Sequence, residues 1–164
     1  MKTVLFVCSG NTCRSPMAEA VARNWVEKQR DRGHLAEDVL VASAGTFASD
    51  GSMPTREATI ALRDAGIDHD GRSKRLTAEM IINATLILCM TEGHRHAVHA
   101  ILDADGHVDD AETLIELLDP QHDIADPIGM PQEIYDDVLH TFMELIPERL
   151  AEYLGITTEA ARDS

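Results

Sequence analysis

The chain has 164 residues, of which 44 % are hydrophobic and only 4 % aromatic, and its 29 acidic and 14 basic residues give a net charge of −15. This length suits one domain, residues 1–164, with a buried core. Since a negative surface repels phosphate backbones and anionic lipids, we expect neither a nucleic acid nor a membrane as a partner. The apolar runs are too short for a secretory signal or a membrane span, so we expect a cytoplasmic protein. We also expect a monomer.

Short apolar runs alternate with helical patterns along the chain, which is typical of an α/β fold. We expect strands at residues 3–8, 39–44, 85–90 and 113–118. Helices are expected over 15–32, over 53–67 with Gly66 as the stop, from Thr77, from Thr91, and over 132–155 with Pro147 as a kink or break. A polar stretch, 105–112, precedes the fourth strand. The pattern predicts a single-domain, doubly wound, flavodoxin-like sheet of about four parallel strands with helices on both faces.

The segment FVCSGNTCRSP, residues 6–16, joins the first strand to the first helix. In a doubly wound sheet, ligands bind beyond the carboxyl ends of the strands. Successive N–H groups of a tight turn, backed by a helix N-terminus, can enclose one tetrahedral anion. We expect the following residues to form this phosphate-binding loop between Cys8 and Arg14: Ser9, Gly10, Asn11, Thr12 and Cys13, with Ser15 directly after it.

The residue types in this loop predict a nucleophilic displacement at phosphorus. Arg14 can hold two phosphate oxygens in a bidentate contact. A thiol among N–H donors, beside an arginine and a helix N-terminus, is expected to be a thiolate at neutral pH, so Cys8 is the predicted nucleophile. The Ser15 hydroxyl can donate to that thiolate and help it leave in a second step.

The string VCSGNTCRSP resembles the signature loop of the low-molecular-weight protein tyrosine phosphatase family, including its arginine phosphatase branch. The resemblance continues through SAGT (43–46), GID (66–68), RSKRLT (72–77), LILCMT (86–91) and the final helix. It implies a cysteine-dependent protein phosphatase that acts on phosphorylated proteins through a phosphocysteine intermediate. It implies no cofactor and no metal.

The departing atom needs a proton, so a carboxylic acid should face the loop. Asp126, in IADPIG, and Asp119, in LLDP, are both followed by proline. In the family that the chain resembles, the general acid is an Asp followed by Pro at this place, and the distance to the last helix together with Gly129 favours Asp126. Asp123 is expected to be solvated.

The resemblance also suggests supporting residues. We expect Ser43 to hydrogen-bond the loop through Asn11, with Ser73 as a further partner, although both could be ordinary turn serines. Many members have a histidine two residues before that second serine. This chain has Gly71 there, so the support of that histidine is either absent or supplied by His69.

Three features bear on the substrate. The arginine phosphatase branch has Thr at the position of Thr12, where tyrosine-specific members carry an apolar residue. Ile128 replaces the aromatic residue that the family carries after Asp-Pro, and Phe47 is the aromatic residue available elsewhere, unless it belongs to the core. An acidic rim, with Asp50, would help a cationic guanidinium. We therefore expect phosphoarginine as the substrate, with phosphotyrosine as the alternative and a small phosphate ester as a third.

The sequence leaves other classes of function open. An arsenate reductase of this fold would need two further cysteines near 80–90, where only Cys89 is found, in an apolar run typical of a buried structural cysteine. A phosphate-binding module without catalysis would not need Asp126. His96 and His99 share a helical face, but no carboxylate or thiolate joins them at ligand spacing, so a solvated face is favoured over a metal site.

The second cysteine of the loop suggests regulation. A reactive Cys8 is a target for peroxide, and overoxidation is irreversible. Cys13 can trap the sulfenic acid as a disulfide that thiols later reduce, or it can simply pack in the core.

Overall fold

The computed structural model describes residues 1–106, 112–157 and 159. Residues 107–111 of the expected polar stretch therefore lie outside the described residues. Within them, four parallel strands form one sheet: β1 (Lys2–Cys8), β2 (Val39–Gly45), β3 (Leu86–Cys89) and β4 (Leu114–Leu117). Their order is β2-β1-β3-β4.

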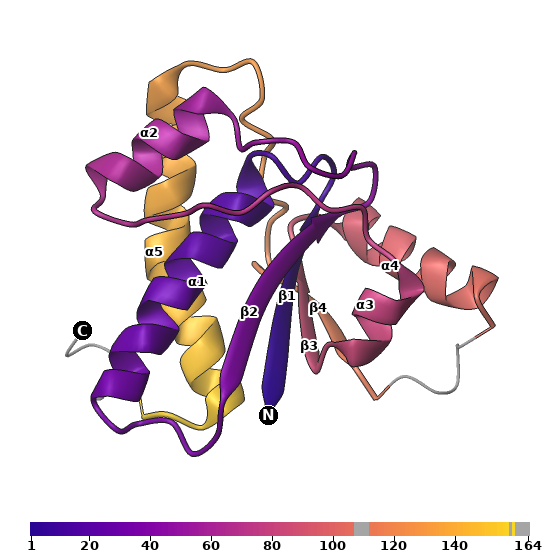
Figure 1. The fold of residues 1–164 in the computed structure, drawn as a ribbon, viewed down its shortest axis with the longest axis horizontal. Helices are drawn as coiled ribbons and strands as arrows, with labels where there is room; N and C mark the ends of the chain where they lie inside the picture. The colour runs from indigo at the N-terminus through magenta and orange to yellow at the C-terminus, as the bar shows by residue number, and fades with distance from the viewer. Residues whose placement is uncertain (107–111, 158, 160–164) are drawn as a thin grey trace.

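Helices cover both faces of this sheet. The helices are α1 (Arg14–Asp31), α2 (Arg56–Asp64), α3 (Ala78–Asn83), α4 (Glu92–Ala104) and α5 (Gln132–Leu154). Figure 1 shows α1, α2 and α5 on one side of the sheet and α3 and α4 on the other. The predicted doubly wound α/β fold is confirmed.

The central strand β1 supplies the core of both layers. Val4 and Phe6 pack in the cluster that includes Phe142 of α5, whereas Leu5 and Val7 pack in the cluster that includes Val98 of α4. Alternate side chains of a strand point to opposite faces, so a strand with a helical layer on each side must be apolar throughout. This explains the continuous run TVLFVC.

Local signals set most helix boundaries. The Thr77 and Thr91 hydroxyls accept from the N–H groups of Met80 and His94, so both threonines cap helices where the sequence indicates. The predicted helix over 53–67 is too long at both ends, since α2 spans Arg56–Asp64 and the Thr55 hydroxyl, which accepts from Ala58 N, sets its start. Helix α5 continues through Pro147 without a break.

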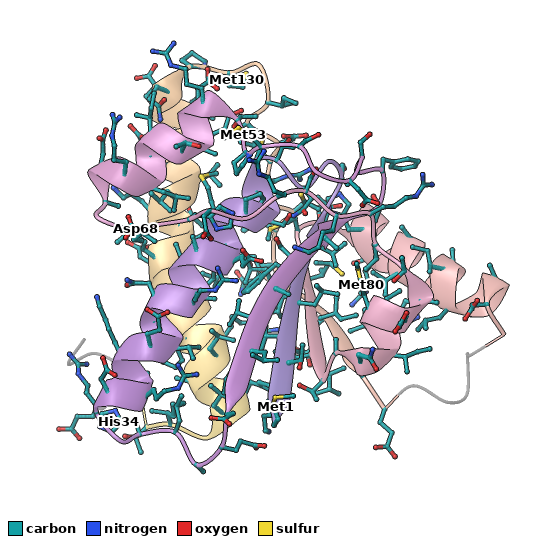
Figure 2. All side chains as sticks on the ribbon, in the orientation of Figure 1. Met1, His34, Met53, Asp68, Met80 and Met130 are labelled. Atoms are coloured by element: carbon teal, nitrogen blue, oxygen red, sulfur yellow. The ribbon has the colours of Figure 1, made fainter. Side chains whose placement is uncertain are left out.

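The strand order positions the functional loop. From β1 the chain crosses through α1 to β2 on one side, and β3 pairs with the other side of β1. Where the chain order of the strands reverses in this way, a crevice opens at the carboxyl end of the first strand. Residues 9–13, between β1 and α1, lie at that point. Figure 2 shows Met53 and Met130, from two loops at this end, far from Met1 at the start of β1.

None of the helices in the described part of the chain is long and apolar enough to cross a membrane.

Candidate active site

Cys8 ends β1, and its side chain lies at the base of the 9–13 loop. The residue is only 2 % exposed. Its Sγ is 2.8 Å from Ser15 Oγ, and it accepts a hydrogen bond of 3.3 Å from the backbone N–H of Asn11. The Asn11 N–H thus donates to the sulfur, and the Ser15 hydroxyl lies within hydrogen-bond distance of it.

Asn11 holds the loop in shape. Its φ is 55°, a left-handed conformation that asparagine tolerates better than most residues. Its amide group donates to Ser15 Oγ at 2.7 Å and to Ser43 Oγ at 2.9 Å, and its carbonyl oxygen accepts from Lys74 N at 2.9 Å. The expected link between Ser43 and Asn11 is thus present, and it runs through the Asn11 side chain.

Arg14, the first residue of α1, connects the loop to the segment that carries the predicted acid. The guanidinium is buried and donates to the carbonyl oxygen of Ile124 at 2.8 Å. Its other terminal nitrogen is 3.4 Å from Asp126 Oδ2, and the Asp126 side chain is 43 % exposed. Asp126 Oδ1 accepts from Ile128 N at 3.1 Å, which fixes the orientation of the carboxylate.

A small cavity, of about 30 Å³, joins these groups. It is lined by Cys8, Gly10, Thr12, Cys13, Arg14, Asp126 and Ile128. A nucleophile, a cation and a carboxylate thus meet in one cavity. Phe47 is 81 % exposed and does not belong to the core.

The other two aspartates of the segment have local roles. Asp119 Oδ1 accepts from Gln121 N, within its own turn. Asp123 Oδ1 accepts from Glu92 N at the start of α4, so it is exposed yet engaged with the protein. Neither lines the cavity, whereas Asp126 does.

A buried carboxylate that the sequence analysis missed supports the loop from behind. Ser43 Oγ, which accepts from Asn11, donates to Glu19 Oε1 at 3.2 Å. Glu19 Oε2 is 3.5 Å from an Arg23 guanidinium nitrogen and 3.3 Å from His69 Nδ1. A glutamate among the apolar residues of the α1 pattern was the available signal, because a buried acid needs partners.

The imidazole of His69 lies directly beside Gly71. A Cβ on Gly71 would lie 2.8 Å from His69 Cε1 and 2.9 Å from Nε2, so the glycine leaves the space that the imidazole fills. Burial lowers the pKa of His69, while the Glu19 charge opposes that shift. His69 thus lies next to Glu19, the carboxylate that accepts from Ser43.

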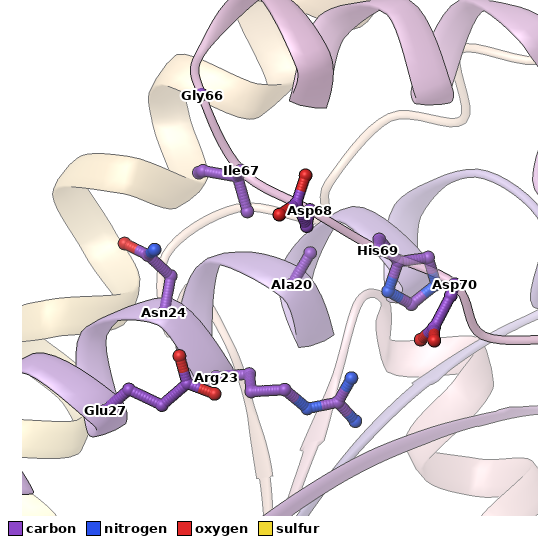
Figure 3. Close-up of a pocket in the computed structure, with 9 residues that line it drawn as sticks. All are labelled: Ala20, Arg23, Asn24, Glu27, Gly66, Ile67, Asp68, His69 and Asp70. Atoms are coloured by element: carbon purple, nitrogen blue, oxygen red, sulfur yellow. The ribbon is translucent and has the colours of Figure 1, made fainter.

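A larger cavity, of about 570 Å³, lies on the outer side of this network. Arg23 and Glu27 of α1 form one wall, and the 66–70 segment, with His69 and Asp70, forms the other (Figure 3). It contains neither a thiol nor Arg14. The candidate active site is therefore the smaller cavity, which holds both the thiol and Arg14.

The expectation for Ser73 was wrong. Its hydroxyl donates to the carbonyl oxygen of Ser49 and accepts from Ser52 N at 2.8 Å. Ser73 thus holds the 49–52 loop rather than Asn11. The partner that Asn11 finds in this segment is the backbone of Lys74.

The three cysteines are all free thiols in buried positions. Cys13 Sγ is 3.4 Å from Tyr135 Oη, and burial, together with this contact, raises the pKa of the Tyr135 hydroxyl to about 12. Burial likewise raises the pKa of Cys89 to about 12, so this thiol is inert at neutral pH. Cys89 is a core residue, as expected.

The histidines of α4 lie apart from any metal-ligand set in the described residues, where no three His, Cys, Asp or Glu side chains gather closely enough to hold an ion. His99 is exposed, and His96 Nε2 lies 3.6 Å from Glu92 Oε1.

The fold and the loop that joins a thiol to a guanidinium define a phosphatase of the cysteine-dependent class. A sequence model of the family "Low molecular weight phosphotyrosine protein phosphatase" matches residues 3–160, and the chain belongs to this family.

Two curated relatives are named protein-arginine-phosphatase. The one from Geobacillus stearothermophilus is 39 % identical over 151 residues, which cover 90 % of this chain and 95 % of the relative. The one from Bacillus subtilis is 36 % identical over 152 residues, or 92 % of this chain and 95 % of the relative. Low-molecular-weight protein-tyrosine-phosphatases match as well, among them one from Staphylococcus epidermidis at 27 % identity over 87 % of this chain and 93 % of the relative.

Solved structures of the family share the fold. The arginine phosphatase YwlE, in a mutant form with a phosphorylated active-site serine, superposes with a TM-score of 0.79 at 32 % identity. The match covers 96 % of this chain and 99 % of that one.

Proposed function

We propose that this phosphatase hydrolyses phosphoarginine in proteins. The observation that carries the proposal is the wall of the small cavity, where the hydroxyl residue Thr12 and the carboxylate of Asp126 accompany the thiol. A planar guanidinium offers N–H donors, which a hydroxyl and a carboxylate oxygen can accept. None of the residues that line this cavity is aromatic, so a phenol ring would lack a stacking partner. The names of the two arginine phosphatase relatives support the same substrate.

In the first step of the proposed mechanism, the Cys8 thiolate attacks phosphorus and the bond from phosphorus to the guanidine nitrogen breaks. Arg14 and the loop N–H groups stabilise the equatorial oxygens. Asp126 gives its proton to the departing nitrogen, which leaves a phosphocysteine and a carboxylate.

In the second step, water attacks the phosphocysteine and Asp126 takes a proton from it. Phosphate leaves, and the Cys8 thiolate is restored. The Ser15 hydroxyl, 2.8 Å from the sulfur, stabilises the departing thiolate by donating to it. No metal enters either step.

The test of substrate class compares Thr12→Ile with wild type on one phosphoarginine peptide and one phosphotyrosine peptide. The kcat/KM for phosphoarginine divided by the kcat/KM for phosphotyrosine is expected to fall in Thr12→Ile. The apolar branched side chain removes the hydroxyl that accepts from the guanidinium, and it narrows the space beside Ile128. Thr12→Val is the matched control that removes the hydroxyl at nearly constant volume. A wild-type enzyme that prefers phosphotyrosine would support the alternative substrate, and an unchanged ratio in Thr12→Ile would contradict the role of Thr12.

We also propose that Cys13 protects Cys8. In this scheme peroxide oxidises Cys8 to a sulfenic acid, and the Cys13 thiol displaces water from it to form a disulfide. Both residues line the same cavity as free thiols, and Cys13 lies five positions after Cys8.

A cytoplasmic location, where thiols are kept reduced, fits this chemistry. We propose that the enzyme acts there as a monomer on phosphorylated proteins.

A further inference from the structure

His94 lies in the first turn of α4, on a different element from every residue of the proposed mechanism. It is 6 % exposed. Its Nε2 is 2.8 Å from Ser9 Oγ, and its Nδ1 is 3.1 Å from Thr91 Oγ1. Both ring nitrogens of a buried imidazole are therefore engaged, and one of them reaches the phosphate-binding loop.

Ser9 is held from two directions. Its carbonyl oxygen accepts from Phe47 N at 2.9 Å, and the neighbouring Cys8 carbonyl oxygen accepts from Thr46 N at 2.9 Å. These bonds fix the carbonyl side of the loop through the 46–47 segment. The side chain of Ser9 has His94 as its partner. The peptide planes between Cys8 and Gly10 determine where the loop N–H groups point, so both sets of contacts orient the anion donors.

The charge state of His94 suits this position. Burial, helped by the Arg14 guanidinium, lowers the pKa of the imidazole to about 4, although the carboxylates of Asp123 and Asp126 favour the charged form. The ring is thus neutral at neutral pH and carries one proton. The Ser9 and Thr91 hydroxyls can each donate or accept, so both hydrogen bonds form in either tautomer.

We propose that His94 is a positioning residue of the phosphate site, which holds Ser9 and through it the first turn of the loop in the shape that accepts a phosphoryl group. This inference rests on the proposed use of the 8–15 loop for phosphate.

Two substitutions separate the two ring contacts. In His94→Gln, the longer amide places a polar group where Nε2 lies and can still reach Ser9. In His94→Asn, the shorter amide reaches the Nδ1 position and cannot. His99→Asn is the matched control, because His99 is an exposed histidine on the same helix.

The measurements are the inhibition constant of inorganic phosphate and kcat/KM. We expect His94→Asn to weaken phosphate binding and lower kcat/KM by about fivefold each, which corresponds to one neutral hydrogen bond. His94→Gln should recover most of this loss, and His99→Asn should match wild type. The dependence of kcat/KM on pH between 6 and 8 should keep its shape, because His94 is already neutral there and transfers no proton.

A double-mutant cycle with Ser9→Ala identifies the pathway. If His94 acts through Ser9, the double variant His94→Asn/Ser9→Ala should lose no more phosphate affinity than either single variant. Additive losses, or an unchanged phosphate constant in His94→Asn, would overturn the inference. If wild type itself does not bind phosphate, the proposed function fails instead. Ser9→Ala removes the same contact from the loop side, so the test stands even if His94→Asn does not fold.

Discussion

Gly45, the last residue of β2, is the position where the fold leaves no room for a side chain beside the phosphate-binding loop. A Cβ at Gly45 would lie 2.4 Å from the Ser9 carbonyl oxygen and 2.9 Å from the Asn11 backbone nitrogen. Both are backbone atoms of the loop, so no flexible side chain can yield. Gly45 is also tied on its other side, because its N–H donates to Lys74 O and its carbonyl oxygen accepts from Leu76 N, both at 2.9 Å.

These distances set the size of the effect of Gly45→Ala. To bring the Cβ and the Ser9 oxygen near a van der Waals separation, one of them must move by roughly 1 Å. Overpacking of this kind costs about 1–3 kcal/mol, which lowers the melting temperature of a chain of this size by ~2–12 °C. A displacement of about 1 Å in a catalytic loop costs roughly 10²-fold in rate. We therefore expect the loss of activity to exceed what the loss of stability explains at 25 °C.

The assay measures kcat/KM on a phosphoarginine peptide and the melting temperature of the same preparations. Gly93→Ala is the matched control, because a Cβ there would lie at an ordinary 3.6 Å from Thr91 Oγ1 and alanine favours a helix. Wild-type kcat/KM in Gly45→Ala, together with an unchanged melting temperature, would refute the argument that the loop backbone excludes a side chain at this position.

Three further predictions follow from the site. Cys8→Ser and Asp126→Ala should each lower single-turnover phosphate release by about 10²-fold or more, since they remove the nucleophile and the proton donor; full activity in either variant contradicts its assigned role. Cys13→Ser should recover less activity than wild type when peroxide treatment is followed by dithiothreitol, because no disulfide protects the sulfenic acid; equal recovery would leave Cys13 as a packing residue. As the pH is lowered from about 6.5 to about 4, the free energy of unfolding should decrease, and His94 should contribute up to ~1.4 kcal/mol per pH unit to this decrease. The reason is that His94 binds a proton in the unfolded chain over this range, whereas the buried imidazole, with its pKa of about 4, does not. The free energy of unfolding, measured by urea denaturation, should depend less on pH in His94→Asn than in wild type. The same pH dependence in both proteins would contradict this assignment.

The fold was predictable because its signals are local. The strand β1 and the threonine caps of α3 and α4 can be predicted from residues within a few positions of one another in the sequence. The start of α2 was less predictable: the pattern predicts a helix from residue 53, but the Thr55 hydroxyl accepts from Ala58 N, so the helix starts at Arg56.

The supporting contacts of the site were only partly predictable. The resemblance predicts the hydrogen bond between Ser43 and Asn11. Ser73 was assigned to the wrong partner, since the 49–52 loop folds back onto its hydroxyl. Glu19 was missed because one acidic residue in an amphipathic helix is more often solvated than buried.

By itself, the sequence determined the residue types from which we propose the chemistry of this loop, because a thiol, an arginine and a turn between a strand and a helix are contiguous in residues 6–16. Only the tertiary structure decided which distant groups complete it. Asp126 rather than Asp119 shares the cavity with Cys8, and His94 reaches Ser9 across 85 positions of the chain. These pairings depend on which loops the parallel strands bring to one edge of the sheet, and hydrogen bonds between such loops have no signature in local spacing.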